Sequence, residues 1–456
     1  MSDSAPLLAG AGGLLTEGSQ STHAGRKALL LTRDSETKEF CALAETMGIE
    51  IVEIIEQRGK ANPRTHLGSG RLASIHDDLS MQPSGHIWTG VDLALIHANL
   101  LPRQIVELTD ALGIEVWDRV RLLLELFTRH ASSVEARTQV RIARLTADRN
   151  ILRELTRRET SGERLGWGAG GRTGWNAVLE TVAAEITSLR RKRDRGVLAV
   201  RERQRQRSAS GARTVGFAGY TNAGKSSLFQ LLTNKPVLVE DKVFSTLETT
   251  VGRMEKSPRV LLIDTIGFID AVPASLLDAF RATLDESLEC DLLLLIIDAS
   301  DSVVEVERRF ATSRRELMER SEARTAQPLE VVLTKSDRCS DSHLAAVLTT
   351  IESLGHDKPI ICSAKSGEGI NSLRQQILTQ LHGPCRTFQL FHPVEQNKPP
   401  IAALESAVRK EMMVLERSIE DYGIELQGWI GEAEWQRLLL EFPDRIKLRP
   451  TDVSEA

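Results

Sequence analysis

The stretch TVGFAGYTNAGKSSLFQLL (residues 214–232) constrains the fold of this chain more than any other feature. An apolar run typical of a buried strand leads into a glycine-containing loop, and the residues from Lys225 onward have helical spacing. The core of the stretch, Gly219 to Ser226, fits the pattern G-x-x-x-x-G-K-S. In this pattern the glycines let backbone N–H groups surround phosphate groups, and the helix N-terminus adds its positive dipole. The sequence therefore predicts a strand–loop–helix unit of an α/β domain that binds a nucleotide.

The side chains of this loop have distinct expected roles. Lys225 reaches the β- and γ-phosphate oxygens, and the hydroxyl of Ser226 is a ligand of Mg²⁺. We therefore expect Lys225 to take part in catalysis. The residues expected to contact the nucleotide here are Gly219, Tyr220, Thr221, Asn222, Ala223, Gly224, Lys225, Ser226 and Ser227.

Three further motifs follow, each beside the end of an apolar run. RVLLIDTIG (259–267) places the carboxylate of Asp264 where it can hold the Mg²⁺ shell, and the N–H of Gly267 can meet the γ-phosphate. LEVVLTKSD (329–337) contains Asp337, whose carboxylate can accept hydrogen bonds from N1–H and N2–H₂ of guanine, a donor pair that adenine lacks. IICSAKSG (360–367) ends a last strand, where a backbone N–H can meet guanine O6. The expected contacts from the last two motifs are Thr334, Lys335, Asp337, Ser363, Ala364 and Lys365.

Four such motifs in this order, each at the carboxyl end of a strand, predict a P-loop domain that selects guanine and takes GTP and Mg²⁺. Thr334 occupies the position of the usual asparagine in N-K-x-D. Threonine keeps a hydroxyl that can brace the loop, and a partial loss of guanine selectivity is left open. Phe268 stands where many self-sufficient GTPases have a water-orienting glutamine. Because a phenyl ring cannot position water, another group must complete the catalytic site.

The stretch EDKVFSTLETTVGRM (240–254) supplies the expected switch threonine. A GTP switch needs a threonine on a mobile loop, whose hydroxyl binds Mg²⁺ and whose N–H meets the γ-phosphate. Thr249 and Thr250 lead into the strand TTVGRM and are better explained as strand residues. We therefore choose Thr246 as the second protein ligand of Mg²⁺ and, with Lys225 and Gly267, as a catalytic residue.

The order of apolar patterns predicts an α/β chain of several domains. Short strand-like runs alternate with helical stretches at the start, which indicates a parallel sheet. A long strand-free region with helical spacing follows and is interrupted by a glycine-rich stretch, so an antiparallel helical hairpin is expected. Its first arm, from residue 120, has helical spacing for about ten turns. The stretch IAALESAVRKEMMVLERSI (401–419) has the pattern of an amphipathic helix. The predicted divisions are a disordered leader (1–25), an α/β domain (26–117), a hairpin (118–207) with its tip at 161–175, a linker (208–212), a GTPase domain with a mostly parallel sheet covered on both faces (213–384), and a small α+β domain (385–456).

Charge is distributed unevenly along the chain. The net charge is −5, yet residues 119–207 contain 21 Lys/Arg against 10 Asp/Glu. A solvated helical surface would explain a smaller excess, whereas this one favours a polyanionic partner. The five cysteines form no C-x-x-C pair, which speaks against zinc sites and disulfide frameworks and favours a reducing compartment. The longest apolar run (292–297) is too short to cross a bilayer. We expect a cytoplasmic monomer without a membrane partner.

Several stretches together resemble the HflX family of translation-related GTPases. They are GYTNAGKSSLF, FSTLETT, DTIGFI and AFRATLDES, and upstream LGSGRLASI and VWDRVRLLLELFTRHASSVEARTQVRIARL. The resemblance covers about residues 27–383. It implies binding to the large ribosomal subunit through the helical hairpin, with its glycine-rich tip toward the peptidyl-transferase region, and a role in splitting or rescuing ribosomes. It also implies a hydrophobic residue in place of the catalytic glutamine, which Phe268 fits.

Two departures from the family pattern leave alternatives open. The tip reads GGRTGWNAVLE instead of a stretch like G-P-G-E, and the base motif reads TKSD. Some family members are reported to use ATP, so ATP use stays open. The leading hypothesis is a GTPase that acts on the ribosome. A signalling switch that binds a protein partner and an RNA-remodelling ATPase are the alternatives.

Overall fold

The chain divides into two compact units, one made mostly of residues 1–199 and the other mostly of residues 200–456. The structure is a computed structural model. It describes residues 23–81, 86–131, 133–161, 172–209, 211–233, 250–264, 290–321, 328–356, 358–393 and 399–449.

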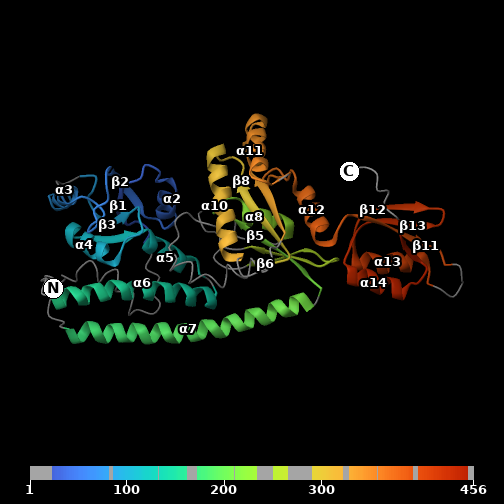
Figure 1. The fold of residues 1–456 in the computed structure, drawn as a ribbon, viewed down its shortest axis with the longest axis horizontal. Helices are drawn as coiled ribbons and strands as arrows, with labels where there is room; N and C mark the ends of the chain where they lie inside the picture. Colours follow the sequence, from blue (N-terminus) through green and yellow to red (C-terminus); the bar gives the residue numbers. More distant parts are fainter. Residues whose placement is uncertain are drawn as a thin grey trace. The chain divides into compact units, whose positions relative to one another are not determined.

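The first unit begins with a four-stranded parallel sheet, as its alternating pattern predicted (Figure 1). The strands have the order β2-β1-β3-β4 and are β1 (Lys27–Thr32), β2 (Glu50–Glu56), β3 (Val91–Ile96) and β4 (Glu115–Asp118). They are joined by α2 (Lys38–Thr46), α3 (Ser69–Ser80) and α4 (Pro102–Leu112). The middle residues of β1 are fully buried, because helices of βαβ units cover both faces of a parallel sheet. Gly68 precedes α3 as its N-cap, so the GSG sequence forms the start of a helix.

The helical region after β4 contains three helices: α5 (Arg119–His130), α6 (Val134–Ser161) and α7 (Arg172–Ala209). The prediction of one continuous first arm is wrong, because α5 ends at His130. Ala131 has extended backbone angles, and the hydroxyl of Ser133 accepts a hydrogen bond from the N–H of Ala136 at 3.0 Å. Serine in this position caps a helix N-terminus, so the local polar residues start a new helix despite the continuing apolar spacing.

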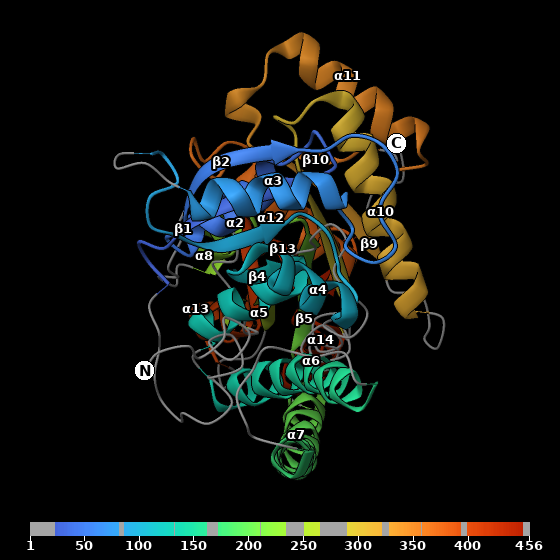
Figure 2. The same ribbon diagram turned by 90° about the vertical axis from the view of Figure 1, so that its left-hand side faces the viewer.

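Helices α6 and α7 pack side by side (Figures 1 and 2). Their contact is a small apolar cluster in which Leu145 and Leu152 of α6 meet Val182 and Ile186 of α7. Arg141 of α6 and Glu185 of α7 form an ion pair at 3.0 Å. The predicted tip at 161–175 lies outside the residues whose side chains the structure describes.

The second unit contains a six-stranded sheet in the order β10-β9-β8-β5-β7-β6. Its strands are β5 (Arg213–Gly219), β6 (Thr250–Glu255), β7 (Val260–Asp264), β8 (Leu292–Asp298), β9 (Leu329–Thr334) and β10 (Ile360–Ile361), all parallel except β6. The helices that surround it include α8 (Lys225–Thr233), α10 (Val303–Ser321), α11 (Asp341–Ser353) and α12 (Ile370–His382). One apolar cluster joins α8 and α12 to the sheet and another joins α10 and α11 to it. Both faces are therefore covered, which explains why every residue of β8 is buried.

The last part of the second unit is a small domain with a second, antiparallel sheet. Its elements are β11 (Arg386–Phe391), α13 (Ile401–Glu411), β12 (Met412–Glu420), β13 (Gly423–Ile430), α14 (Glu432–Glu441) and β14 (Ile446–Leu448). With the strand order β12-β13-β11-β14, this is the β-α-β-β-α-β arrangement of ferredoxin-like domains. The predicted helix over 401–419 is wrong in its second half. Residues 412–420 instead pair with β13 along its whole length, so tertiary pairing overrides the helical periodicity.

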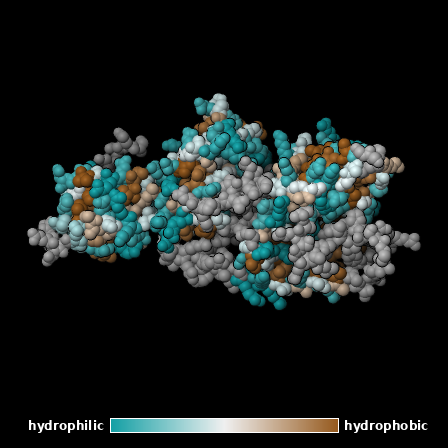
Figure 3. Space-filling model, turned by 180° about the vertical axis from the view of Figure 1, so that it is seen from behind, coloured by the Kyte–Doolittle hydropathy of each residue, from teal (hydrophilic) through white to brown (hydrophobic). Residues whose placement is uncertain are grey.

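The surface of the molecule is mixed in character. On the face drawn in Figure 3, hydrophobic side chains lie in several separate areas bordered by hydrophilic ones. Among the helices that the structure describes, none has the length and apolar character needed to span a membrane.

Candidate nucleotide-binding site

The loop between β5 and α8 has a backbone that its glycines make possible. Gly219 has φ +142°, and a Cβ atom there would lie 2.2 Å from the carbonyl oxygen of Ile296 in β8. Gly224 has φ +90°, and Asn222 has φ 61° in the left-handed region that asparagine tolerates. The loop therefore curls tightly over the edge of the sheet, directly before the first turn of α8.

Lys225 begins α8, and its side chain is only 6% exposed. Its Nζ donates hydrogen bonds to the carbonyl oxygens of Gly219 at 3.1 Å and Tyr220 at 2.7 Å, inside the curve of the loop. Burial lowers the pKa of Lys225 to about 8, although the nearby carboxylate of Asp264 opposes this shift. A buried ammonium whose pKa is depressed gains from a strong anionic partner, and phosphate groups are such a partner.

Ser226, in the first turn of α8, meets Asp264, the last residue of β7. The hydroxyl of Ser226 donates to Oδ2 of Asp264 at 2.9 Å, and both residues are buried. A hydroxyl beside a carboxylate is a donor set that suits Mg²⁺, which favours oxygen ligands and keeps several waters. In the described part of the chain, no group of three or more His, Cys, Asp or Glu side chains could hold a metal ion. A Mg²⁺ ion at Ser226 would take further oxygen ligands from phosphate groups and water.

Thr334, at the end of β9, braces the phosphate loop. Its hydroxyl lies 2.7 Å from the carbonyl oxygen of Ala223 and 3.0 Å from that of Ile297. The side chain is 1% exposed and packs beside Gly224, where an added Cβ would lie 3.6 Å from it. The hydroxyl thus connects the phosphate loop to strands β8 and β9, which is the bracing role expected for the residue that replaces asparagine.

The predicted base-reading residues lie together on neighbouring loops. The hydroxyl of Ser363 donates to Oδ1 of Asp337 at 2.6 Å, and this bond is the main cause that holds the pKa of Asp337 below its usual range. Ser363 is fully buried, and its oxygen in turn accepts from the N–H of Lys365 at 3.2 Å. The fixed serine thus orients an ionised, exposed carboxylate, which is the form that can accept two hydrogen bonds from guanine.

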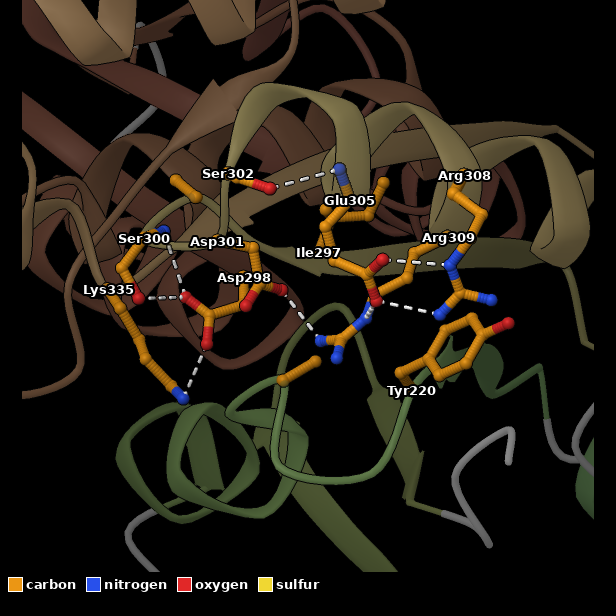
Figure 4. A network of polar contacts seen from close by, with 12 residues as sticks. Tyr220, Ile297, Asp298, Ser300, Asp301, Ser302, Glu305, Arg308, Arg309 and Lys335 are labelled. Carbon is orange, nitrogen blue, oxygen red and sulfur yellow. Dashed lines mark hydrogen bonds and ion pairs between the residues drawn. The ribbon is translucent and has the colours of Figure 1, made fainter. Parts of the chain in front are cut away.

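Lys335 connects this region to residues that the sequence did not single out. Its Nζ forms an ion pair with Oδ2 of Asp298 at 2.6 Å, and Oδ1 of Asp298 accepts from the hydroxyl of Ser300 at 2.6 Å (Figure 4). Lys335 also has φ 57°, in the left-handed region. Asp298 is the last residue of β8, so its place at the carboxyl end of a fully apolar strand was a usable signal.

A second missed group lies beside the phosphate loop. Asp301 and Glu305 both hold the guanidinium of Arg309, each at 2.6 Å, and Figure 4 shows this guanidinium beside Tyr220. The guanidinium carbons of Arg309 and Arg308 lie 5.3 and 5.9 Å from the centre of the Tyr220 ring. These distances are within the range of cation–π contacts. The start of α10 therefore holds the second residue of the phosphate loop in place, a contact that no sequence motif announces.

The structure thus gathers described residues of all four motifs at one edge of the six-stranded sheet. Thr246 and Gly267, together with Phe268, lie outside the described residues. The structure also describes three other predicted nucleotide contacts, which are Thr221 in the phosphate loop, Ser227 in α8 and Ala364 in the last motif.

Comparison with known proteins agrees with this geometry. A family model described as "50S ribosome-binding GTPase" matches residues 214–335, and another described as "GTP-binding GTPase N-terminal" matches residues 34–128. The GTPase HflX of Methanocaldococcus jannaschii is 30% identical over 373 residues, which are 80% of this chain and 89% of the relative. The GTPase HflX of Escherichia coli K12 is 30% identical over 438 residues, which are 92% of this chain and 97% of the relative.

Among solved structures, a GTP-binding protein from Sulfolobus solfataricus in complex with GDP is 24% identical, with a TM-score of 0.42 over 78% of this chain and 98% of that one. The extent of the sequence matches decides the family. The chain belongs to the HflX family of GTPases, and it binds guanine nucleotide and hydrolyses GTP.

Proposed function

We propose that this protein is a Mg²⁺-dependent GTPase that acts on the large ribosomal subunit, which it binds through the helical hairpin of α6 and α7. One observation supports the choice of an RNA partner above the others. Several arginines of α6 are paired within the protein, whereas a group of exposed basic residues on α7 is left for a partner.

On α6 several arginines are neutralised within the protein. Arg158 pairs with Asp110 at 2.8 Å, and Arg144 pairs with Glu125 at 3.1 Å. On α7, by contrast, Arg190, Arg191 and Lys192 are exposed. Within the described part of the chain they form no ion pair, so their charges face solvent.

The charges on the two helices also repel one another. Burial lowers the pKa of Arg149 on α6, and the neighbouring guanidinium groups of Arg153 and Arg190 lower it further. A row of phosphate groups along the hairpin would relieve this repulsion and release counterions, which is how basic helices bind nucleic acid. A protein partner would need an equally dense acidic surface, so rRNA is the partner that we propose.

In the proposed reaction a water molecule attacks the γ-phosphate of GTP in line with the bond to the β-phosphate oxygen. Lys225 exchanges the carbonyl oxygens of Gly219 and Tyr220 for phosphate oxygens, so its charge faces the group that is transferred. Mg²⁺, when bound at Ser226, neutralises charge on the β- and γ-phosphates. Asp264 accepts the hydrogen bond that orients the hydroxyl of Ser226. We assign the switch role to Thr246 and the γ-phosphate N–H to Gly267.

Asp337 selects the base in this proposal, and Lys335 lies across the base plane. Phe268 cannot orient the attacking water, so the group that does so comes from the ribosome or from a rearranged loop. This predicts slow hydrolysis by the protein alone and faster hydrolysis with large ribosomal subunits. ATP is the less suitable substrate in this proposal, because adenine lacks the pair of donors that the carboxylate of Asp337 would accept from guanine.

The test is GTP turnover with and without large subunits across a salt series, for wild type and for a variant with Arg190→Glu, Arg191→Glu and Lys192→Glu. We expect the variant to lose most of the stimulation and to show a flatter salt dependence, by about one in log–log slope for each lost phosphate contact. The matched control reverses three exposed charges of the first sheet domain, Arg58, Lys60 and Arg71.

Equal stimulation of the wild type and the α7 variant would refute the hairpin as the binding element. Absence of any stimulation by large subunits, combined with normal intrinsic turnover, would favour a signalling switch. Base competition in which ATP displaces GTP at equal concentration would favour an ATPase.

A further inference from the structure

The second unit contains a pocket that shares no lining residue with the nucleotide-binding site. It has a volume of about 130 Å³ and lies where the end of α12 and the start of β5 meet the small C-terminal domain. Arg213 and His382 line it from the GTPase domain. Phe388, Arg386, Trp429 and Trp435 line it from the C-terminal domain.

Two of these lining residues carry nitrogen atoms that lack a partner. Nε1 of Trp429 and Nε2 of His382 are buried and make no hydrogen bond with any described residue. Trp429 is only 3% exposed, and its indole N–H can act as a donor but never as an acceptor. Buried polar groups without partners are uncommon in folded proteins, and those that occur call for an explanation such as a bound molecule.

Among the charged residues that line the pocket, Arg386 is available to bind an anion. Arg213 is paired with Asp291 at 2.9 Å. Arg386 is partly buried, and within the described chain its guanidinium makes neither a hydrogen bond nor an ion pair. His382 is neutral at pH 7, because burial and the charge of Arg213 lower its pKa to about 4. Glu432 also lines the pocket, but it is exposed and accepts a hydrogen bond from Gln436.

The remaining walls are apolar and flat. The rings of Phe388 and Trp435 lie 5.1 Å apart between centroids, and Leu381 and Pro384 add aliphatic surface. A dry apolar cavity of about 150 Å³ is known to hold one benzene molecule, so a pocket of this size admits a single ring with a small substituent.

We propose that this pocket is a binding site for a small organic carboxylate of about the size of benzoate. The carboxylate accepts hydrogen bonds from the guanidinium of Arg386 and from the indole N–H of Trp429, and the flat apolar body lies against Phe388 and Trp435. A planar guanidinium binds a carboxylate through two parallel hydrogen bonds, which suits this ligand class better than a single point charge would. Because residues of two domains line the site, a bound ligand stabilises their junction, independently of the proposed ribosomal role.

The first experiment titrates the full-length protein with benzoate and follows the indole N–H resonances of its six tryptophans. The resonance of Trp429 is assigned by its loss in Trp429→Phe. We expect this resonance to shift saturably with benzoate, together with a rise in melting temperature that grows with ligand concentration. Benzyl alcohol, which has the ring without the charge, and acetate, which has the charge without the ring, should each bind at least tenfold more weakly.

Variants then identify the groups that bind the carboxylate. Arg386→Gln should weaken benzoate binding at least tenfold, because it removes a charge-assisted hydrogen bond. Arg386→Lys keeps the charge and should bind with intermediate affinity, which also guards against loss of folding in the glutamine variant. Arg449→Gln is the control, since Arg449 is exposed on the same domain and pairs with Glu425.

Three outcomes would overturn the proposal. The first is a Trp429 resonance that does not move with benzoate, which would mean that only water satisfies these nitrogens. The second is equal binding of benzoate by wild type and Arg386→Gln. The third is equal binding of benzoate and benzyl alcohol, which would show that the pocket recognises a ring and no anion.

Discussion

Replacing Thr334 with valine keeps the shape of a fully buried side chain and removes only its hydroxyl. In the wild type this hydroxyl lies 2.7 Å from the carbonyl oxygen of Ala223, in the phosphate loop, and 3.0 Å from that of Ile297. One hydroxyl has one hydrogen, so it donates mainly to the nearer carbonyl, that of Ala223. Leaving a buried acceptor without its donor costs about 1–3 kcal/mol.

Because the lost bond holds the phosphate loop, the cost falls on binding of the phosphates. We expect Thr334→Val to weaken GDP and GTP binding by about 5- to 150-fold, the range that corresponds to 1–3 kcal/mol. The preference for guanine over adenine should stay unchanged, since the Ala223 carbonyl belongs to the loop that we expect to hold the phosphates. We therefore expect Thr334 to affect affinity and, under the proposed function, Asp337 to select the base.

The assay is displacement of a fluorescent GDP analogue by GDP, GTP and ATP, for wild type and Thr334→Val. Thr349→Val serves as the control, because the hydroxyl of Thr349 donates to the Ala345 carbonyl at 3.0 Å on the exposed side of α11. A variant that keeps its GDP affinity but gains ATP binding would refute the reasoning, because Thr334 would then be a base-selecting residue.

Three further predictions concern the same site. Burial lowers the pKa of Lys225 to about 8 in the free protein, so above this pH the side chain is neutral and must take up a proton when it binds phosphate. GDP affinity should therefore be constant below pH 8 and fall above it. Calorimetry at pH 9 in two buffers of different ionisation enthalpy would measure the proton uptake. Asp337→Asn should weaken GTP binding by about 1–3 kcal/mol and shift preference toward xanthosine nucleotides, whose C2 carbonyl finds a donor amide, as a competition titration would show. Gly219→Ala should lower the melting temperature in circular dichroism, because φ +142° and a contact of 2.2 Å with Ile296 leave no room for a methyl group; an unchanged melting curve would contradict the described loop geometry.

The nucleotide site was predictable because each of its motifs is local. G-x-x-x-x-G-K-S specifies a strand, a turn and a helix start within nineteen residues, and its glycines have backbone angles that side chains resist. Asp264 and Asp337 follow apolar runs, and the carboxyl ends of parallel strands meet at one edge of a sheet. The motifs alone therefore predicted that these distant residues come together.

The sequence could not predict which side chains of different helices form ion pairs. The arginines of α6 and α7 look alike as a basic stretch, but Arg144 and Arg158 meet acidic residues from other helices while Arg190 and Arg191 meet none that the structure describes. The network of Asp298 and Arg309 likewise depends on how α10 packs beside the phosphate loop.

Residues 401–419 show most directly where local pattern fails. The apolar spacing of a helix continues past Glu411, yet the chain becomes strand β12 because β13 offers a complete row of hydrogen-bonding partners. Sequence by itself determined the elements whose geometry is set by their own residues: the phosphate loop, the buried parallel strands and the base-reading motifs. Only the tertiary structure decided which charges are neutralised, where helix α13 gives way to strand β12, and which buried nitrogens are left without partners among the described residues. Each of these depends on atoms that lie far away along the chain.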